Sequence, residues 1–260
     1  MNISSLNEFT DFKGRSVIVT GASGGIGAGI AKRFAEAGAQ VFIHFRSDEA
    51  GAAALVHEIN DAGGQAKKVY ADVSNKMDVE AMFAQISREA ESLDVLINNA
   101  GNYPQNSIID MEEEDWDSVI NSNLRSTFLC TQTVTKYMSK NKGGSIVNIA
   151  SIEGQSPTPL HSHYCAAKSG VIMFTRTSAN ELAQNNIRCN VILPGLIWAE
   201  GIEENWPEGV EGWKKAAPLT RLGQAKDVAN ACLFLSSDAA SWITGAELRV
   251  DGGVMSNKIF

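Results

Sequence analysis

The sequence contains few cysteines and no pattern that would bind a metal ion. Four cysteines occur among the 260 residues, none of them in a Cys-x-x-Cys pair or at ligand spacing from a histidine. Disulfide-stapled domains and zinc sites need such spacings, so both are excluded. We expect reduced thiols, most of them in the core, and no metal site.

Positive charge is also scarce. The 22 lysines and arginines stand against 30 aspartates and glutamates, which gives a net charge of -8. No basic cluster interrupts this acidic balance. An acidic surface repels the phosphates of nucleic acid and the headgroups of anionic membranes. Neither is therefore an expected partner, and a small molecule is the expected ligand.

Long hydrophobic runs are missing as well. The sequence has no stretch of about twenty apolar residues, the length that a membrane-spanning helix requires. Residues 1–11 lack the basic and apolar segments of a secretory signal. With 44% hydrophobic residues, the chain can bury one sizeable core. The sequence thus predicts one cytoplasmic domain over residues 1–260.

What is present is a regular alternation of strand and helix patterns. Short apolar segments predict strands at 16–20, 41–45, 66–71, 94–98, 145–150, 188–192 and 247–250. Helices are predicted after the first strand and at 50–61, 76–91, 116–139, 163–185 and 225–235. This alternation predicts an α/β fold with one doubly wound parallel sheet, a Rossmann fold, and helices on both faces. Ligands then bind at the carboxyl ends of the strands.

The first of these ends carries a glycine-rich turn. The segment Gly21-Ala-Ser-Gly-Gly-Ile-Gly27 joins the predicted strand at 16–20 to a helix with apolar residues at Ile30 and Phe34. Glycines allow a tight turn and a close approach to a pyrophosphate, whose charge the helix N-terminus receives. Alone, such a turn is equally consistent with a purely structural role.

A tyrosine and a lysine form the second chemical feature. Tyr164 and Lys168 are four residues apart in a predicted helix, so they lie on one face, one turn apart. Free tyrosine titrates near ~10, and a nearby cation lowers the pKa of the phenol towards neutral pH. Ser151 precedes Tyr164 by thirteen positions. We therefore expect a tyrosine acid or base with a lowered pKa.

Taken together, the motifs resemble one family in order and spacing. They are Thr20-Gly21-x-x-x-Gly25-x-Gly27, Asn98-Asn99-Ala100-Gly101, Asn123, Ser151, Tyr164-x-x-x-Lys168 and Pro194-Gly195. Over about residues 13–253 the chain resembles the classical short-chain dehydrogenase/reductase family. The resemblance implies hydride transfer between a nicotinamide cofactor and a carbonyl or secondary alcohol.

The resemblance also implies a catalytic tetrad of Asn123, Ser151, Tyr164 and Lys168. Tyr164 transfers a proton to or from the substrate oxygen, and Ser151 bonds the same oxygen. Lys168 lowers the phenol pKa and bonds the nicotinamide ribose, and Asn123 holds a water. Asn121 competes with Asn123 for this role, and either asparagine is equally able to cap or kink the helix.

The cofactor contacts implied by the resemblance follow the strand ends. They are Gly21, Ser23, Gly25, Ile26, Gly27, Arg46, Ser47, Asp72, Val73, Asn99, Ala100, Gly101, Tyr164, Lys168, Pro194, Gly195 and Ile197. Most relatives place an acid for the NAD ribose where this chain has Phe45. The next residue, Arg46, favours the 2′-phosphate of NADP, because a guanidinium pairs with phosphate better than with a hydroxyl. NADP(H) is the expected cofactor, and NAD(H) remains open through Asp48.

Substrate recognition is less constrained by the sequence. The resemblance implies a substrate lid at about 196–217, and candidate substrate contacts at Glu153, His161, Trp198 and Trp206, although the tryptophans also suit ordinary packing. Open alternatives are a 3-oxoacyl-acyl carrier protein reductase, a sugar, polyol or hydroxysteroid dehydrogenase using NAD, and a non-catalytic nucleotide-binding protein. An acidic carrier protein would associate slowly with this acidic chain.

The resemblance further implies a homodimer or homotetramer built on the helices at 116–139 and 163–185. Six apolar positions there exceed what one sheet face is expected to need: Val119, Leu124, Phe128, Val134, Val171 and Phe174.

Overall fold

The computed structural model describes residues 10–138 and 143–256. Its strands are β1 (Ser16–Val19), β2 (Gln40–Phe45), β3 (Gln65–Tyr70), β4 (Val95–Asn98), β5 (Gly144–Ile149), β6 (Ile187–Pro194) and β7 (Glu247–Val250). Its α-helices are α1 (Gly25–Glu36), α2 (Glu49–Asp61), α3 (Lys76–Glu89), α4 (Glu113–Ile120), α5 (Ser126–Val134), α6 (Ser162–Leu182), α7 (Ile202–Asn205), α8 (Pro207–Ala216) and α9 (Ala225–Ser236).

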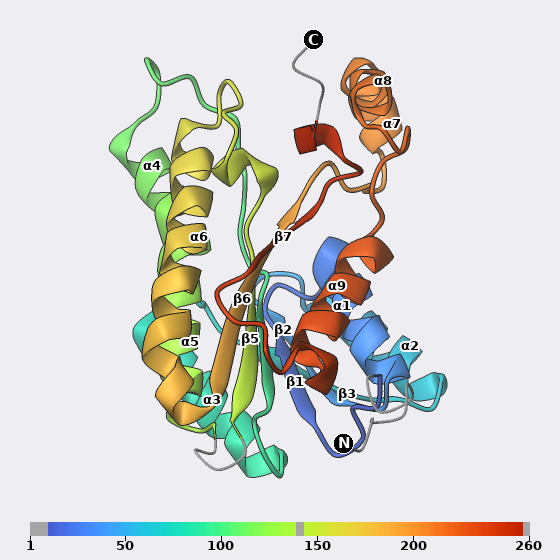
Figure 1. The fold of residues 1–260 in the computed structure, drawn as a ribbon, viewed down its shortest axis with the longest axis vertical. Coiled ribbons are helices and arrows are strands. Elements are labelled where there is room, and N and C mark those ends of the chain that lie inside the picture. The colour runs from blue at the N-terminus through green and yellow to red at the C-terminus, as the bar shows by residue number, and fades with distance from the viewer. Residues whose placement is uncertain (1–9, 139–142, 257–260) are drawn as a thin grey trace.

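Within these ranges the seven strands form one parallel sheet in the order β3-β2-β1-β4-β5-β6-β7. Helices α3 to α6 cover one face, and α1, α2 and α9 cover the other (Figure 1). The sheet is therefore the middle layer of three. The predicted doubly wound α/β fold is confirmed.

Side chains that alternate along the strands build a core on each face. In β1, Val17 and Val19 pack with α1 and α9, whereas Ile18 packs with α3 and α5. Because both faces are covered, the strand is apolar at every position, as buried parallel strands usually are. The apolar runs that predicted the strands are thus a direct consequence of the three layers.

The helix predicted at 116–139 is the main departure. Helix α4 begins earlier, at Glu113, because Glu112 and Asp115 form a capping box around its first turn. A π-helical turn, Asn121–Arg125, then separates α4 from α5. The last α-helical residue is Val134, and the predicted end at Ser139 lies outside the described residues.

The apolar positions assigned to subunit assembly also need correction. Val119, Val134 and Val171 are completely buried within the chain itself, because they fill the space between the helices and the sheet. Leu124 is half-buried and packs beside α6. Of the six, Phe128 is 40% exposed and Phe174 is half-buried like Leu124, so these three leave apolar surface open.

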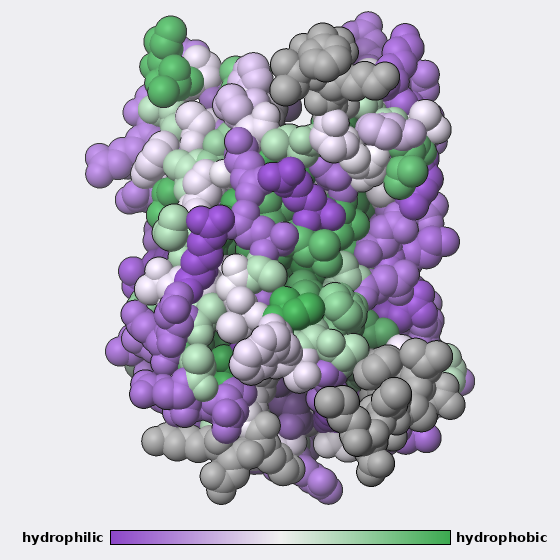
Figure 2. Space-filling view, in the orientation of Figure 1, coloured by the Kyte–Doolittle hydropathy of each residue, from purple (hydrophilic) through white to green (hydrophobic). Residues whose placement is uncertain are grey.

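Two further surfaces carry apolar side chains. Figure 2 shows such side chains along the middle of one face, over β7 and beside α9. The loop before α4 also exposes two apolar side chains, Ile108 and Ile109, at 77% and 89%. No helix in the described part of the chain has both the length and the apolarity to cross a membrane.

Candidate active site

The glycine-rich turn lies between the end of β1 and the start of α1. Gly21 and Gly25 have φ angles of +60° and +54°, in the left-handed region that glycine adopts without strain. A Cβ on Gly27 would lie 2.4 Å from the carbonyl oxygen of Gly21. No side chain caps the first N–H groups of α1, and its first turn holds no acidic residue. This positive helix end fits a pyrophosphate.

The turn is tied to the end of β4 by hydrogen bonds. The hydroxyl of Thr20 accepts from the backbone N–H groups of Asn99 and Ala100, at 2.9 and 3.0 Å. The Asn99 side chain donates to the carbonyl oxygens of Thr20 and Gly21, at 3.0 and 2.9 Å. Asn99 and Ala100, both predicted cofactor contacts, thus lie beside the glycine turn.

His44 is a further support of this turn that the sequence analysis missed. Its Nδ1 accepts from the Gly21 N–H at 2.9 Å, and its Nε2 lies 3.0 Å from the carbonyl oxygen of Ala71. The imidazole is therefore neutral, with its proton on Nε2, and burial lowers the pKa of His44. A histidine inside the apolar run Val-Phe-Ile-His-Phe was the available signal.

The residues after β2 bear on the choice of nucleotide. Arg46 and Ser47 are exposed. Asp48 caps α2, because its Oδ1 accepts from the Gly51 N–H at 2.9 Å. One oxygen of Asp48 is thereby engaged in starting the helix.

Asp72 and Val73 follow β3 on the same edge of the sheet. Asp72 Oδ1 accepts from the N–H and the hydroxyl of Ser74, at 2.9 and 2.6 Å. Burial acts to raise the pKa of Asp72, but these bonds and the charge of Arg46 outweigh it, so the pKa lies below its usual value. Arg46 is thus electrostatically close to this carboxylate. Val73 is buried and packs into the core.

Ser23 and Ile26 are half-buried within the glycine-rich segment, and Gly101 is exposed after β4. On the opposite side, Pro194 ends β6, and the N–H of Gly195 donates to Val250 at 3.0 Å. Ile197 pairs with Gly223 in an isolated bridge.

Ser151, Tyr164 and Lys168 meet at the end of β5. Ser151 caps the short turn Ile152–Gly154, and its hydroxyl accepts from the Glu153 N–H at 3.1 Å. Lys168 Nζ lies 5.4 Å from the centre of the Tyr164 ring and donates to Ile149 O at 2.9 Å. Ser151 is close enough for its hydrogen bonding to act on the Tyr164 hydroxyl.

The expected lowering of the tyrosine pKa is wrong for this structure. The pKa of Tyr164 is raised, first by burial and then by the negative charge of Glu153, and the hydrogen bond from Ser151 does not outweigh them. Burial also lowers the pKa of Lys168 to about 8. The same desolvation disfavours the charged form of both side chains.

Asn123, in the π-helical turn, is buried beside the residues that follow β4, whereas Asn121 is half-buried. Its Nδ2 donates to Asn102 O at 2.8 Å and to Val119 O at 3.0 Å. Its Oδ1 is buried without a donor among the described residues, and a Cβ on Gly101 would lie 2.2 Å from it. An unsatisfied buried acceptor of this kind is suited to an ordered water.

Comparison with known proteins shows the family of the chain. A family model described as enoyl-(acyl carrier protein) reductase matches residues 21–255. The 3-oxoacyl-[acyl-carrier-protein] reductase of Staphylococcus aureus (strain N315) is 38% identical over 240 residues, which cover 92% of this chain and 98% of that protein. The chain belongs to the classical short-chain dehydrogenase/reductase family. It is an NAD(P)-dependent oxidoreductase that interconverts carbonyl and alcohol groups.

Two other relatives support the same assignment. The 3-oxoacyl-[acyl-carrier-protein] reductase of Chlamydia trachomatis serovar D is 40% identical over 92% of this chain and 97% of its own length. A crystal structure described as a "putative short-chain alcohol dehydrogenase" from Sinorhizobium meliloti 1021 superimposes with a TM-score of 0.91 at 34% identity. It covers 96% of this chain and 100% of that one.

In this dehydrogenase/reductase, Glu153 and His161 lie near Tyr164. Glu153 Oε2 is 2.9 Å from His161 Nδ1, and the rings of His161 and Tyr164 have centres 5.9 Å apart. The Tyr103 ring centre lies 6.0 Å from that of Tyr164. His163, by contrast, is completely buried and lies in the core.

The segment 196–217, predicted from the sequence as a lid, contains α7 and α8. Trp198 and Trp206 are about half exposed, at 51% and 53%, and Trp206, which precedes α8, packs closely on Gly209 in that helix. Trp213, which is half-buried, packs closely on Gly195 instead. Trp213 therefore lies against Gly195, one of the predicted cofactor contacts.

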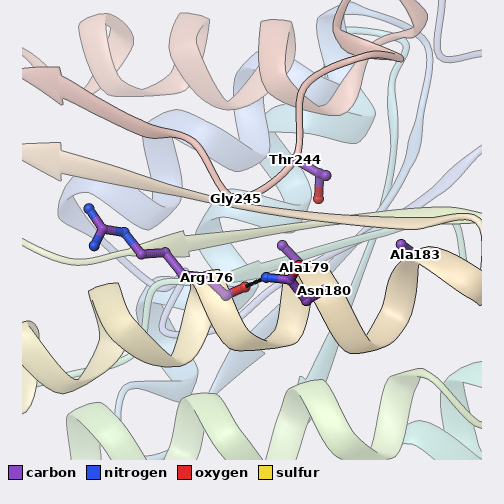
Figure 3. A pocket seen from close by; sticks show the side chains of 6 residues that line it. All are labelled: Arg176, Ala179, Asn180, Ala183, Thr244 and Gly245. Atoms are coloured by element: carbon purple, nitrogen blue, oxygen red, sulfur yellow. Dashed lines mark hydrogen bonds between the residues drawn. The ribbon is translucent and has the colours of Figure 1, made fainter.

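A separate cavity of about 440 Å³ lies elsewhere on the reductase, between α6 and the turn before β7. Figure 3 shows its lining, in which Asn180 donates to Arg176 O at 2.8 Å. Arg176 follows Tyr164 by twelve helical residues, about 18 Å along α6. This cavity is therefore distinct from the tyrosine site. Among the described residues, no three His, Cys, Asp or Glu side chains are grouped to hold a metal.

Proposed function

We propose that the chain is an NADP(H)-preferring reductase or dehydrogenase that acts on a small ketone or secondary alcohol. The observation that carries this proposal is the convergence of Ser151, Tyr164 and Lys168 next to the glycine turn. A pyrophosphate cradle and a proton donor lie on the same edge of the sheet, as hydride transfer to a carbonyl requires.

The residues for cofactor binding follow from the site. The N-terminus of α1 would receive the pyrophosphate, Asp72 and Val73 would border the adenine, and Ile197 would face the nicotinamide. When bound, the nicotinamide supplies or accepts the hydride. The remaining cofactor contacts are those on the strand ends: Gly21, Ser23, Gly25, Ile26, Gly27, Ser47, Asn99, Ala100, Gly101, Pro194 and Gly195.

Each member of the tetrad has a physical task in this proposal. Tyr164 gives its proton to the carbonyl oxygen during reduction and takes it back during oxidation. Ser151 donates a hydrogen bond to that oxygen, where negative charge develops. Lys168 bonds the nicotinamide ribose, and Asn123 holds a water at its unsatisfied Oδ1.

The test of this function is a variant that removes the hydroxyl proton of Tyr164 and keeps its aromatic ring. Tyr164→Phe should reduce turnover about 10²- to 10⁴-fold in an assay of NADPH oxidation over a panel of ketones. Tyr137→Phe, at an exposed tyrosine that follows α5 and stacks on Phe83, is the matched control and should retain wild-type turnover. A Tyr164→Phe enzyme with most of its activity would remove the basis of the proposal.

The preference for NADP rests on Arg46. Arg46 is exposed at the end of β2 and electrostatically close to Asp72, and Asp48 is engaged as a helix cap, so phosphate binding is favoured over ribose binding. Arg46→Ala should raise KM for NADPH about ten- to a hundredfold and leave KM for NADH nearly unchanged. Arg33→Ala on α1 is the control. Equal losses for both nucleotides would contradict phosphate recognition, and a wild-type preference for NADH would assign the ribose to Asp48.

A 3-oxoacyl-acyl carrier protein reductase is the second candidate, because both curated relatives described above carry that name. Against it stands the net charge of -8, which disfavours an acidic carrier. The efficiency of reduction of an acetoacetyl group on a carrier protein, compared with the same group on coenzyme A, distinguishes the two candidates. A strong preference for the carrier would favour the second.

The proposal includes self-assembly through α5 and α6. Phe128 and Met173 are 40% and 56% exposed, and the Phe128 ring meets Phe174 edge-on at 6.2 Å. Covering such a surface in a homodimer or homotetramer would bury apolar area. Light scattering at micromolar concentration should give more than 27.9 kDa, and a particle of that mass would contradict assembly.

We further propose that residues 1–260 act as one domain with a lid at 196–217, in the cytoplasm. One sheet joins all strands of the described ranges, which supports a single domain. The four cysteines are free thiols, as is usual in a reducing compartment. Cell fractionation with an antibody to the chain tests the location.

A further inference from the structure

Glu153 and His161 form a polar pair at the reacting end of the proposed substrate site. Glu153 follows Ser151 by two residues, and His161 precedes Tyr164 by three, so the pair connects both segments that carry the reacting hydroxyls. Their side chains are 23% and 10% exposed, and Oε2 and Nδ1 are 2.9 Å apart. Cys165 Sγ lies 3.9 Å from the same Oε2.

The pair has unused hydrogen-bonding capacity. A carboxylate only accepts, so Nδ1 of His161 carries the proton that joins the two side chains. His161 Nε2 is buried and has no partner among the described residues. In the same part of the chain, no donor contacts Glu153 Oε1, although Glu153 keeps some exposure. The His161 ring centre lies 5.9 Å from that of Tyr164, and the charge of Glu153 acts on the Tyr164 hydroxyl.

Holding the local fold together does not account for the pair. The turn Ile152–Gly154 is already fixed by the bond from Glu153 N–H to Ser151 Oγ and by Ser169 Oγ, which donates to Gly154 O at 2.6 Å. The carboxylate also raises the pKa of Tyr164. This opposes formation of the phenolate, so a carboxylate at this position needs another benefit.

We propose that Glu153 and His161 form a substrate subsite for a hydrogen-bond donor, a hydroxyl or ammonium group close to the reacting carbonyl. This subsite rests on the proposed function, and it restricts the substrates to ketones that carry a hydroxyl or ammonium group near the carbonyl. A hydroxyl can donate to Glu153 Oε1, while His161 holds the carboxylate through Oε2, and an ammonium group pairs with the same carboxylate. An unsubstituted alkyl ketone would leave these groups unpaired, which is the strongest basis for polar discrimination.

Three ketones of nearly equal size provide the test: hydroxyacetone, aminoacetone and butanone. Binding to the enzyme with NADP⁺ is measured by ligand-observed NMR, and kcat/KM is measured with NADPH. The wild type should favour hydroxyacetone or aminoacetone over butanone by about ten- to a hundredfold. A hydroxyl and an ammonium group are distinguished by which of the two ketones is preferred.

Two variants attribute that preference to the pair. Glu153→Gln removes the charge and should abolish any preference for aminoacetone, while hydroxyacetone retains part of its advantage. Glu153→Met removes the acceptor and should reduce both ratios to butanone to near one. Glu91→Gln, an exposed carboxylate after α3, is the control and should keep the wild-type ratios.

Equal binding of the three ketones by the wild type, or wild-type ratios in Glu153→Met, would overturn the subsite. These results differ from failure of the proposed function. If no ketone is reduced but hydroxyacetone or aminoacetone binds better to the wild type than to Glu153→Met, the subsite stands and the reaction does not. If all three are reduced equally, the reaction stands and the subsite is refuted.

Discussion

Replacement of Lys168 by methionine should make the protein more stable at neutral pH while it removes a residue of the proposed tetrad. Lys168 is 4% exposed, and its Nζ has one protein acceptor, Ile149 O at 2.9 Å. Burial lowers the pKa of Lys168 from 10.5 to about 8. The charged form is therefore destabilised in the folded state relative to the unfolded chain.

The magnitude follows from this shift. The difference between 10.5 and about 8 corresponds to about 3 kcal/mol of unfolding free energy at pH 7. Losing the bond to Ile149 O costs about 1 kcal/mol, so Lys168→Met should gain about 2 kcal/mol. Between pH 8 and pH 10.5 the unfolded chain binds more protons than the folded one at this site. The penalty therefore disappears in the wild type as the pH rises through that window, and the advantage of the variant disappears with it.

Urea unfolding of wild type and Lys168→Met, at several pH values from 7 to 9.5, measures this difference. The advantage of the variant should decrease by about 2 kcal/mol over that range. Lys136→Met is the control, because Lys136 is 58% exposed and its distance to Glu80 is 3.7 Å. Its effect should stay within about 0.5 kcal/mol at every pH. A destabilised Lys168→Met protein whose difference from wild type does not change with pH would refute the reasoning.

Two other predictions concern the glycine turn. Gly27→Ala places a Cβ 2.4 Å from Gly21 O and 2.7 Å from Asn99 Nδ2, so NADPH affinity in a fluorescence titration should fall at least about tenfold. Gly212→Ala is the control, because a Cβ there meets no atom within 4 Å, and this variant should bind NADPH as the wild type does. Equal NADPH affinities of the Gly27→Ala and Gly212→Ala variants would contradict the close-packed turn. The pKa of His44 is lowered by burial, so its contribution to stability is present above its unfolded pKa of 6.5 and is lost as the pH falls below that value. Thermal unfolding measures this loss between pH 6.5 and pH 5. In His44→Gln, which keeps an acceptor and a donor, the unfolding temperature should fall less over this range than in the wild type. An equal fall in both proteins would exclude His44 as the source of the loss.

Local chemistry explains which features could be predicted from the sequence. The strand ends and the glycine turn depend on short-range patterns, namely apolar runs and residues with special backbone freedom. The spacing of Tyr164 and Lys168 depends only on helical geometry. The fold and the convergence of the motifs were therefore predictable.

Features that depend on distant neighbours were not predictable in this way. The bonds of His44 connect the ends of β1, β2 and β3, which are separate in sequence. The pKa of Tyr164 depends on how deeply the phenol is buried and on Glu153. Phe45 is 7% exposed and packs on Tyr70, so an aspartate there would introduce a buried charge as well as a ribose acceptor.

The π-helical turn Asn121–Arg125 makes the number of residues between α4 and α5 important for the position of Asn123. A π turn contains one residue more than the α turn it replaces, and one residue rotates the helix by about 100°. Deletion of a single residue here would allow α4 and α5 to merge into one regular helix and would turn the side chain of Asn123 away from Asn102. A deletion of this kind would improve the helix while it dismantles the site. The irregular turn therefore places Asn123 beside Asn102, and under the role proposed for Asn123 a related chain without the extra residue should not hold the proposed water.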